Sequence, residues 1–218
     1  MGVGPVNVIH LFGDVWITNT VTSTWVMMAL IVAAAIVLGK RQPVALEMVV
    51  DFLMDTIGDV MGENAAVYLP FLGSLAIFLA VANTVGVVPG IISPTRDIST
   101  PLALAITVFF AVHYFGIKAK GLLQYLKDLA SPLYLLPLML PLELIGQFSR
   151  TLSLTLRLFG NIISGELVVA VIFSLVPLFV QLPLVGLSLF TGLLQAYIFT
   201  VLATVYIGAG VEASESGA

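Results

Sequence analysis

Long stretches without any charged residue dominate the chain. The charge-free windows cover residues 15–39, 64–95, 98–117 and 167–211. About 20 apolar residues span the core of a bilayer as a helix, so each of the first three windows fits one crossing. The last window fits more than one, and Pro177 and Pro183 mark a turn within it because proline is disfavoured inside helices. The pattern predicts an all-α integral membrane protein with five transmembrane helices.

The predicted helices form a single membrane domain over residues 1–218. We place the crossings at about residues 21–39, 66–92, 100–117, 138–176 and 184–208. At 1.5 Å per residue the fourth helix would be roughly 58 Å long, against a hydrocarbon core of about 30 Å. It must tilt steeply or lie partly outside the core. We expect it to form a steeply tilted C-terminal hairpin with the fifth helix.

A different pattern occupies residues 43–63. Acidic residues recur there every four positions with apolar residues between them: Glu47, Asp51, Asp55, Asp59 and Glu63. This is the pattern of an amphipathic helix, which we expect to lie in plane at the cytoplasmic face of the membrane. The acidic stripe indicates either a protein partner or a solvated polar face.

Basic residues set the expected orientation, because lysine and arginine favour cytoplasmic loops. Lys40 and Arg41 follow the first span and three lysines follow the third, whereas the loop between the second and third spans has only Arg96 beside Asp97. We therefore expect the N-terminus outside and the C-terminus in the cytoplasm, in a bacterial or archaeal plasma membrane.

The composition excludes several other classes of protein. Hydrophobic residues make up 60% of the 218 residues and charged residues 9%, whereas soluble proteins have about 25% charged residues. A net charge of −4 does not supply the basic surface that nucleic acid requires. The chain has no cysteine and two distant histidines, so we expect no disulfide, no metal site and no cofactor.

Polar residues interrupt the fourth predicted span at spacings of 4, 3, 7, 4 and 5: Glu143, Gln147, Arg150, Arg157, Asn161 and Glu166. The first five share one stripe of a helix, and Glu166 lies at its margin. An arginine at mid-membrane costs about 2.5 to 3.5 kcal/mol, so it marks a functional site by default. Arg150 can reach toward Glu143 two turns away, whereas Arg157 has no aligned carboxylate on its helix. We expect its partner on another chain; the alternative is an internal ion pair.

Small residues accompany this stripe and would let a helix of another subunit approach closely: Gly146, Ser149, Ser153, Gly160, Ser164 and Gly165. On the last span Ser188, Thr191 and Gln195 share a face at i, i+3 and i+7. This face predicts a polar, hydrated path between the last two helices. For Thr191 alone we expect a hydrogen bond to its own backbone.

Two segments carry a family resemblance. Residues 153–167, Ser-Leu-Thr-Leu-Arg-Leu-Phe-Gly-Asn-Ile-Ile-Ser-Gly-Glu-Leu, closely resemble the signature of subunit a of rotary F-type ATP synthases. Residues 194–199, Leu-Gln-Ala-Tyr-Ile-Phe, resemble the last-helix motif of that family. The resemblance implies a stationary ion channel beside a rotating c-ring, with the peripheral-stalk subunit b as a further partner. It implies no enzyme, and the chain has no Walker A loop.

The resemblance also implies roles for single residues. Arg157 would be the essential counter-charge to the ring carboxylates and the barrier to leakage between two half-channels. The outer half-channel would be lined by Asn161, Glu166 and Gln195. Glu143 and Arg150 would lie at the inner one. Many relatives have a histidine or an acidic residue where this chain has Ser188, so the outer path would depend on water or metal-ion coordination.

The compact chain with its second arginine resembles the sodium-type branch known as N-ATPases, and the sequence leaves the transported ion open between H+ and Na+. A stand-alone secondary cation transporter or channel is the alternative function. It would need its ion-binding carboxylates on this chain and would usually show inverted repeats, of which we find none. An intramembrane enzyme would need a nucleophile with a base or a metal, and His10 and His113 form no paired motif.

Overall fold

The computed structural model describes residues 7–12, 15–41, 43–86, 93–129, 136–175 and 181–212. A short antiparallel hairpin comes first, with strands β1 (Asn7–Phe12) and β2 (Val15–Thr18). The helices are α1 (Asn19–Arg41), α2 (Pro43–Met61), α3 (Ala65–Val85), α4 (Ser99–Lys120), α5 (Leu122–Leu129), α6 (Leu136–Leu175) and α7 (Gln181–Glu212). Two 3-10 turns, η1 (Gly62–Asn64) and η2 (Pro94–Arg96), precede α3 and α4. The helical fold class is confirmed; the sequence pattern predicted neither the hairpin nor α5.

Four helices in the described part of the chain are long and apolar enough to cross a bilayer. They are α3, α4, Pro141–Ile172 within α6 and Leu182–Val211 within α7. The apolar part of α1, Val21–Val37, is shorter. The second crossing was expected to reach residue 92, but α3 ends at Val85, and residues 87–92 lie outside the described ranges.

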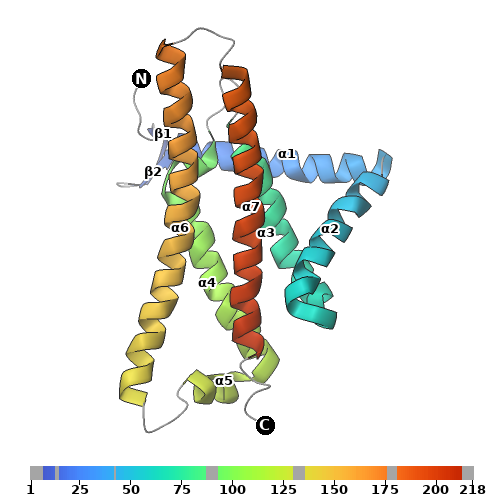
Figure 1. Cartoon of the computed structure of the whole chain (residues 1–218), viewed down its shortest axis with the longest axis vertical. Coiled ribbons are helices and arrows are strands. Elements are labelled where there is room, and N and C mark those ends of the chain that lie inside the picture. The colour runs from blue at the N-terminus through green and yellow to red at the C-terminus, as the bar shows by residue number, and fades with distance from the viewer. Residues whose placement is uncertain are drawn as a thin grey trace.

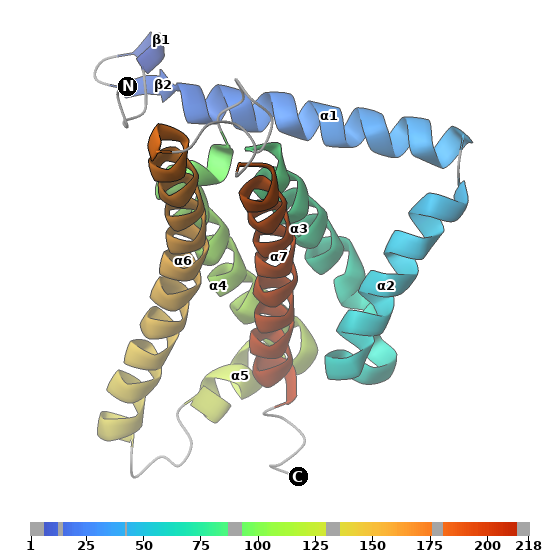
Figure 2. The same cartoon turned by 45° about the horizontal axis from the view of Figure 1, so that its top comes forward.

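The long helices form a bundle in which α6 and α7 run side by side in opposite directions (Figure 1). Helix α7 packs against α3, α4 and α6. Helix α1 runs crosswise to α6 and α7 at one end of this bundle, and α2 returns from the far end of α1 toward α3 (Figure 2). The short helix α5 lies at the opposite end of the bundle, beside α4.

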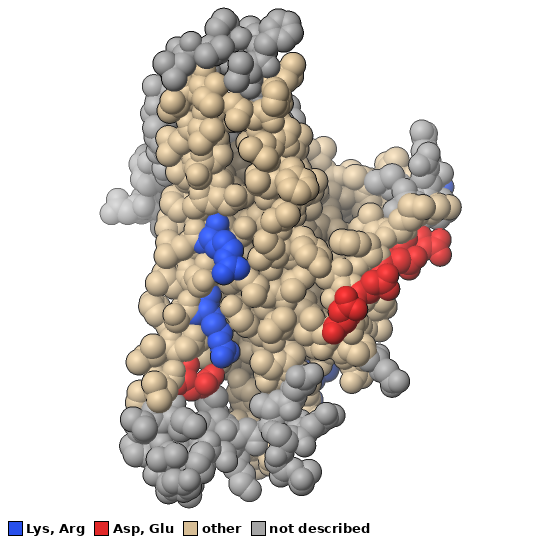
Figure 3. All heavy atoms as spheres, viewed as in Figure 1, with Lys and Arg blue, Asp and Glu red and all other residues tan. Residues whose placement is uncertain are grey.

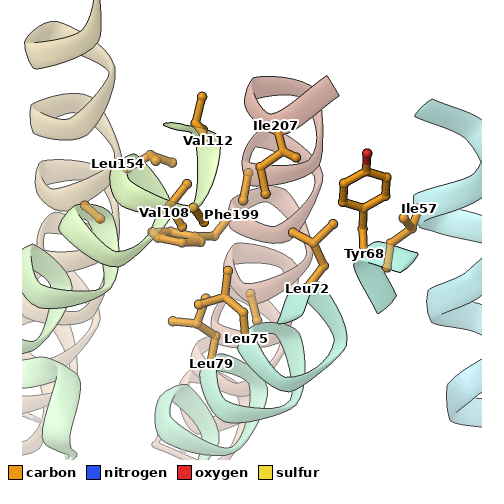
Figure 4. Close-up of a cluster of buried hydrophobic side chains, with 14 of the residues drawn as sticks. Ile57, Tyr68, Leu72, Leu75, Leu79, Val108, Val112, Leu154, Phe199 and Ile207 are labelled. Atoms are coloured by element: carbon orange, nitrogen blue, oxygen red, sulfur yellow. The ribbon is translucent and has the colours of Figure 1, made fainter. Parts of the chain in front are cut away.

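The apolar core lies where α7 meets α3, α4 and α6 (Figure 4). Its fully buried side chains come from five helices: Ile57, Leu72, Leu79, Val108, Leu158, Phe199 and Ile207. Many large apolar side chains point outward instead; Trp25 is 60% exposed and Phe110 is 65% exposed. An outward apolar surface of this kind is normal for helices that face lipid.

Helix α2 presents two different faces. Its four described acidic side chains are exposed and form a row along the helix (Figure 3): Glu47, Asp51, Asp55 and Asp59. On the inner side Leu53 and Ile57 are buried against the bundle, while Leu46 and Val49 stay exposed. The side chain of Glu63, the fifth member of the predicted stripe, lies outside the described part of the chain.

Candidate functional site

The two arginines of α6 lie on an exposed face of the molecule. Arg150 and Arg157 are both exposed, and Figure 3 shows two basic patches one above the other along α6, with an acidic patch below the lower one. Among the described residues, Arg157 has no hydrogen-bond or ion-pair partner. The alternative, an internal ion pair of Arg157 with Glu143 or Glu166, is therefore not formed.

The small residues of α6 leave space beside this face. A Cβ atom added to Gly146 or Gly160 would meet no other side chain or distant backbone within 4 Å. Ser149, Ser153 and Ser164 are exposed. Because small residues allow close approach between helices in lipid, this side of α6 can accept a helix of another subunit.

Arg150 has an aromatic partner rather than the predicted carboxylate. Its guanidinium carbon lies 5.5 Å from the centre of the Tyr206 ring of α7, within the range of a cation–π interaction. Glu143 instead accepts a hydrogen bond from Gln147, with 3.1 Å between Nε2 and Oε1. Among the described residues Arg150 therefore forms no ion pair with Glu143, whose Oε1 accepts from Gln147 instead.

The polar residues near the start of α6 border a small cavity. Gln147, Arg150 and Thr151 line it together with Tyr206 and several apolar residues of α4. Burial and, to a lesser degree, the negative charge of Glu143 raise the pKa of Tyr125 on α5. Glu143 therefore acts electrostatically on α5 as well as on its own helix.

A larger cavity of about 170 Å³ separates α6 from α7 farther along. Asn161, Ser164 and Gly165 line it from α6, and Ser188 and Thr191 line it from α7. The helices are close here, since a Cβ atom on Gly165 would lie 3.6 Å from Ser188 Oγ. Thr191 donates to the backbone oxygen of Leu187 at 2.9 Å, which confirms the expected bond to its own helix.

Gln195 does not line this cavity, although the sequence placed it on the same face as Ser188. It is only 6% exposed, and among the described residues its Nε2 atom has no hydrogen-bond partner. Leaving a buried donor unsatisfied costs about 1 to 3 kcal/mol. Gln195 is therefore a buried polar group whose hydrogen-bond donor is unsatisfied among the described residues.

Glu166 lies on the opposite side of α6 from Arg157 and not at the margin of the stripe as the sequence predicted, because nine residues correspond to about two and a half helical turns. Its Oε2 lies 2.9 Å from Nε of Arg96 in η2. Sequence reasoning did not assign Arg96 to the site. The available signal was a lone basic residue in a loop expected to face outward, but nothing local connects that loop to α6.

The described residues contain no group of three or more histidine, aspartate or glutamate side chains placed to hold a metal ion. In the described part of the chain the arrangement instead consists of one exposed arginine without a partner, two cavities with polar residues in their lining and one ion pair, on a largely apolar bundle. Such an arrangement can stabilise a negative charge brought by another subunit, and it can solvate small cations.

Comparisons with known proteins agree with the sequence motifs. The family model described as "ATP synthase A chain" matches residues 15–208. The chain is 46% identical to ATP synthase subunit a 2 of Bradyrhizobium sp. strain BTAi1 over 212 residues, which cover 94% of each chain. It is 43% identical to ATP synthase subunit a 2 of Picosynechococcus sp. strain PCC 7002, over 99% of this chain and 95% of the relative. The chain therefore belongs to the ATP synthase subunit a family.

Proposed function

We propose that this chain is the stator ion channel of a rotary ATP synthase, with Arg157 as the counter-charge to the c-ring carboxylates. As a member of its family the chain is a non-catalytic subunit of the membrane-embedded F0 sector, and ATP chemistry takes place on other subunits. Membership also implies association with the c-ring and subunit b. The roles of single residues, the two half-channels and the transported ion are the proposal.

The exposed, unpartnered guanidinium of Arg157 is the observation that carries this proposal. An arginine directed at lipid is costly, and the open space beside Gly160 allows a partner helix to approach it. A carboxylate on the ring would supply the missing negative charge. The guanidinium of Arg157 would be the counter-charge.

The ring carboxylate changes its charge as the ring turns. Facing lipid it must be neutralised by a proton or Na+, because burying a bare charge costs many kcal/mol. Beside Arg157 it can be ionised, since an adjacent positive charge stabilises the charged form. An ion that enters by one half-channel and leaves by the other must therefore travel with the ring. Arg157 blocks the direct route between the two half-channels. Each ion that leaked along this route would dissipate about 2.3 kcal/mol per 100 mV.

The two polar regions on either side of Arg157 support two offset half-channels. The cavity of about 170 Å³ at Asn161 and Ser188 would belong to the outer half-channel, with Glu166 beyond it. The polar residues Glu143, Gln147 and Arg150 would border the inner one. Gln195, buried near the centre, would complete its hydrogen bonds by donating its amide N–H to an acceptor on the ring.

The proposed membrane orientation follows from the basic residues. Lys40 lies in the last turn of α1, and Lys118 and Lys120 lie in the last turn of α4, so these helix ends would face the cytoplasm and the N-terminus would lie outside. If α1 crosses the bilayer as the fifth span, then α6 and α7, which run crosswise to it, are strongly inclined in the membrane (Figure 2). Helix α2 with its acidic row would lie in plane at the cytoplasmic face.

Cross-linking to the ring tests the proposal directly. Gly160→Cys should form a disulfide with a cysteine placed on the outer helix of the ring, because no described residue of this chain covers that position. Tyr114→Cys on α4 is the control, since its side chain is 61% exposed on a different helix. Cross-linking of Tyr114→Cys in preference to Gly160→Cys would contradict the proposed position of the ring.

A further inference from the structure

Arg96 and Glu166 connect two segments that are far apart in the chain. Arg96 Nε lies 2.9 Å from Glu166 Oε2, and each side chain is 36% exposed. The neighbouring Asp97 forms no ion pair with Arg96 in the described part of the chain; its Oδ1 accepts a hydrogen bond from the backbone N–H of Ser99 at the start of α4. In the described part of the chain, Glu166 is therefore the ion-pair partner of Arg96.

A buried hydrogen-bond network fixes the backbone just before Arg96. Thr95 is fully buried, and its Oγ1 donates to Asn83 Oδ1 at 3.3 Å. Ser93 Oγ lies 2.7 Å from Thr95 Oγ1 and donates to the backbone oxygen of Ala82. Asn83 Nδ2 in turn donates to the backbone oxygen of Gly192 at 3.0 Å. The loop that carries Arg96 is thus attached to both α3 and α7.

This attachment makes the ion pair different from an ordinary surface pair. A surface pair contributes little, because two long side chains must be ordered in water. Here the backbone of η2 is already held by the network to α3, so the pair orders only the two side chains of Arg96 and Glu166. The pair joins η2 to α6 at Glu166, next to Gly165, which lines the cavity between α6 and α7.

The guanidinium changes how Glu166 interacts with small cations. A carboxylate beside an ion path binds a proton or Na+ unless another positive charge offsets it. An adjacent arginine, which is always protonated, weakens that binding by about tenfold or more. Without Arg96, an ion that reached Glu166 would be held there and released slowly.

We propose that Arg96 is a positioning residue of the outer half-channel: its guanidinium offsets the negative charge of Glu166, so that transported ions pass without being held. This inference rests on the outer half-channel proposed above. It gives Glu166 a fixed positive partner in a chain where Ser188 stands at the position from which many relatives offer a titratable side chain. In this role Glu166 sets the electrostatic potential along the path and does not itself bind ions and pass them on.

ATP-driven pumping by the intact complex in inverted membrane vesicles tests this inference. Arg96→Gln should lower coupled flux by about tenfold, because Glu166 loses its counter-charge. Glu166→Gln should also lower flux, because Arg96 then repels cations without a partner. The double variant should restore most of the flux, since neither charge is left alone, and Arg96→Lys should keep more flux than Arg96→Gln. Asp97→Asn is the control with native flux: it removes a charge from the same loop and keeps the oxygen that accepts from Ser99.

Two results would overturn the inference. One is native pumping by Arg96→Gln. The other is a double variant as slow as either single variant, which would mean that Arg96 only braces the loop. Ser188→Leu separates these failures from a failure of the half-channel itself, because it fills the cavity without touching the ion pair. If Ser188→Leu slows the flux but the Arg96 variants do not, only this inference is refuted. If Ser188→Leu and the Arg96 variants all keep native flux, the outer half-channel is refuted as well.

Discussion

Replacing Asn83 with alanine removes the amide that joins α3 to α7 and to the loop of Arg96. The amide makes two hydrogen bonds, to the backbone oxygen of Gly192 at 3.0 Å and from Thr95 Oγ1 at 3.3 Å. Asn83 is only 8% exposed, so water cannot readily replace either bond. We expect Asn83→Ala to destabilise the chain while leaving the helices themselves intact.

The magnitude follows from these two bonds. Hydrogen bonds between helices of a membrane protein contribute about 0.6 kcal/mol on average and up to about 1.7 kcal/mol. Two of them therefore amount to about 1 to 3 kcal/mol. For a chain of this size 1 kcal/mol lowers the melting temperature by about 2 to 4 °C, so the expected decrease is roughly 2 to 12 °C.

Thermal unfolding of the purified chain in detergent, followed by circular dichroism of its helices, measures this decrease. Thr84→Val is the matched control on the same helix, because Thr84 Oγ1 donates to the backbone oxygen of Ala80 within α3 and links no other element. An Asn83→Ala variant that melts together with wild type and Thr84→Val would refute the argument that this network ties the loop to the bundle.

Three further outcomes are expected. Gly116→Ala should lower the melting temperature in the same assay, because its Cβ would lie 2.6 Å from the Tyr125 ring, whereas Gly146→Ala, with open space around it, should not. Arg150→Ala should reduce ATP-driven pumping without abolishing it, because its observed contact is the Tyr206 ring and not an essential carboxylate; complete loss would contradict this. A membrane-impermeant thiol reagent should label Ile98→Cys from outside only, since Ile98 is 45% exposed beside η2, and labelling from the cytoplasm would reverse the proposed orientation.

The helices were the most predictable part of this fold, for a physical reason. A helix that crosses lipid must satisfy its own backbone and exclude charge, so its signature lies in consecutive residues. Charge-free windows indicated α3, α4 and α7 directly, and the four-residue period of Glu47, Asp51 and Asp55 indicated the exposed acidic row of α2. The exposed position of Arg157 followed from spacing along one helix.

Contacts between helices were much less predictable. The sequence predicted that Arg150 reaches toward Glu143, whereas the guanidinium of Arg150 contacts the Tyr206 ring on α7. The partner of Glu166 is Arg96, on a loop before α4 whose position depends on the Asn83 network. Periodicity describes neighbours one or two turns away on the same helix. It carries no information about which distant loop folds back onto a helix, so these pairs needed the three-dimensional structure.

The central claim is that Arg157 is the obligatory counter-charge, and one pair of flux measurements tests it most directly. The assembled complex with Arg157→Ala is reconstituted in vesicles, and both ATP-driven pumping and passive ion flux are recorded beside wild type and Arg150→Ala. The account predicts that pumping is lost in Arg157→Ala and that passive leak rises, because the ring carboxylate loses its partner and the barrier between the half-channels is removed with it. An assembled Arg157→Ala complex that pumps at a near-native rate would contradict the account.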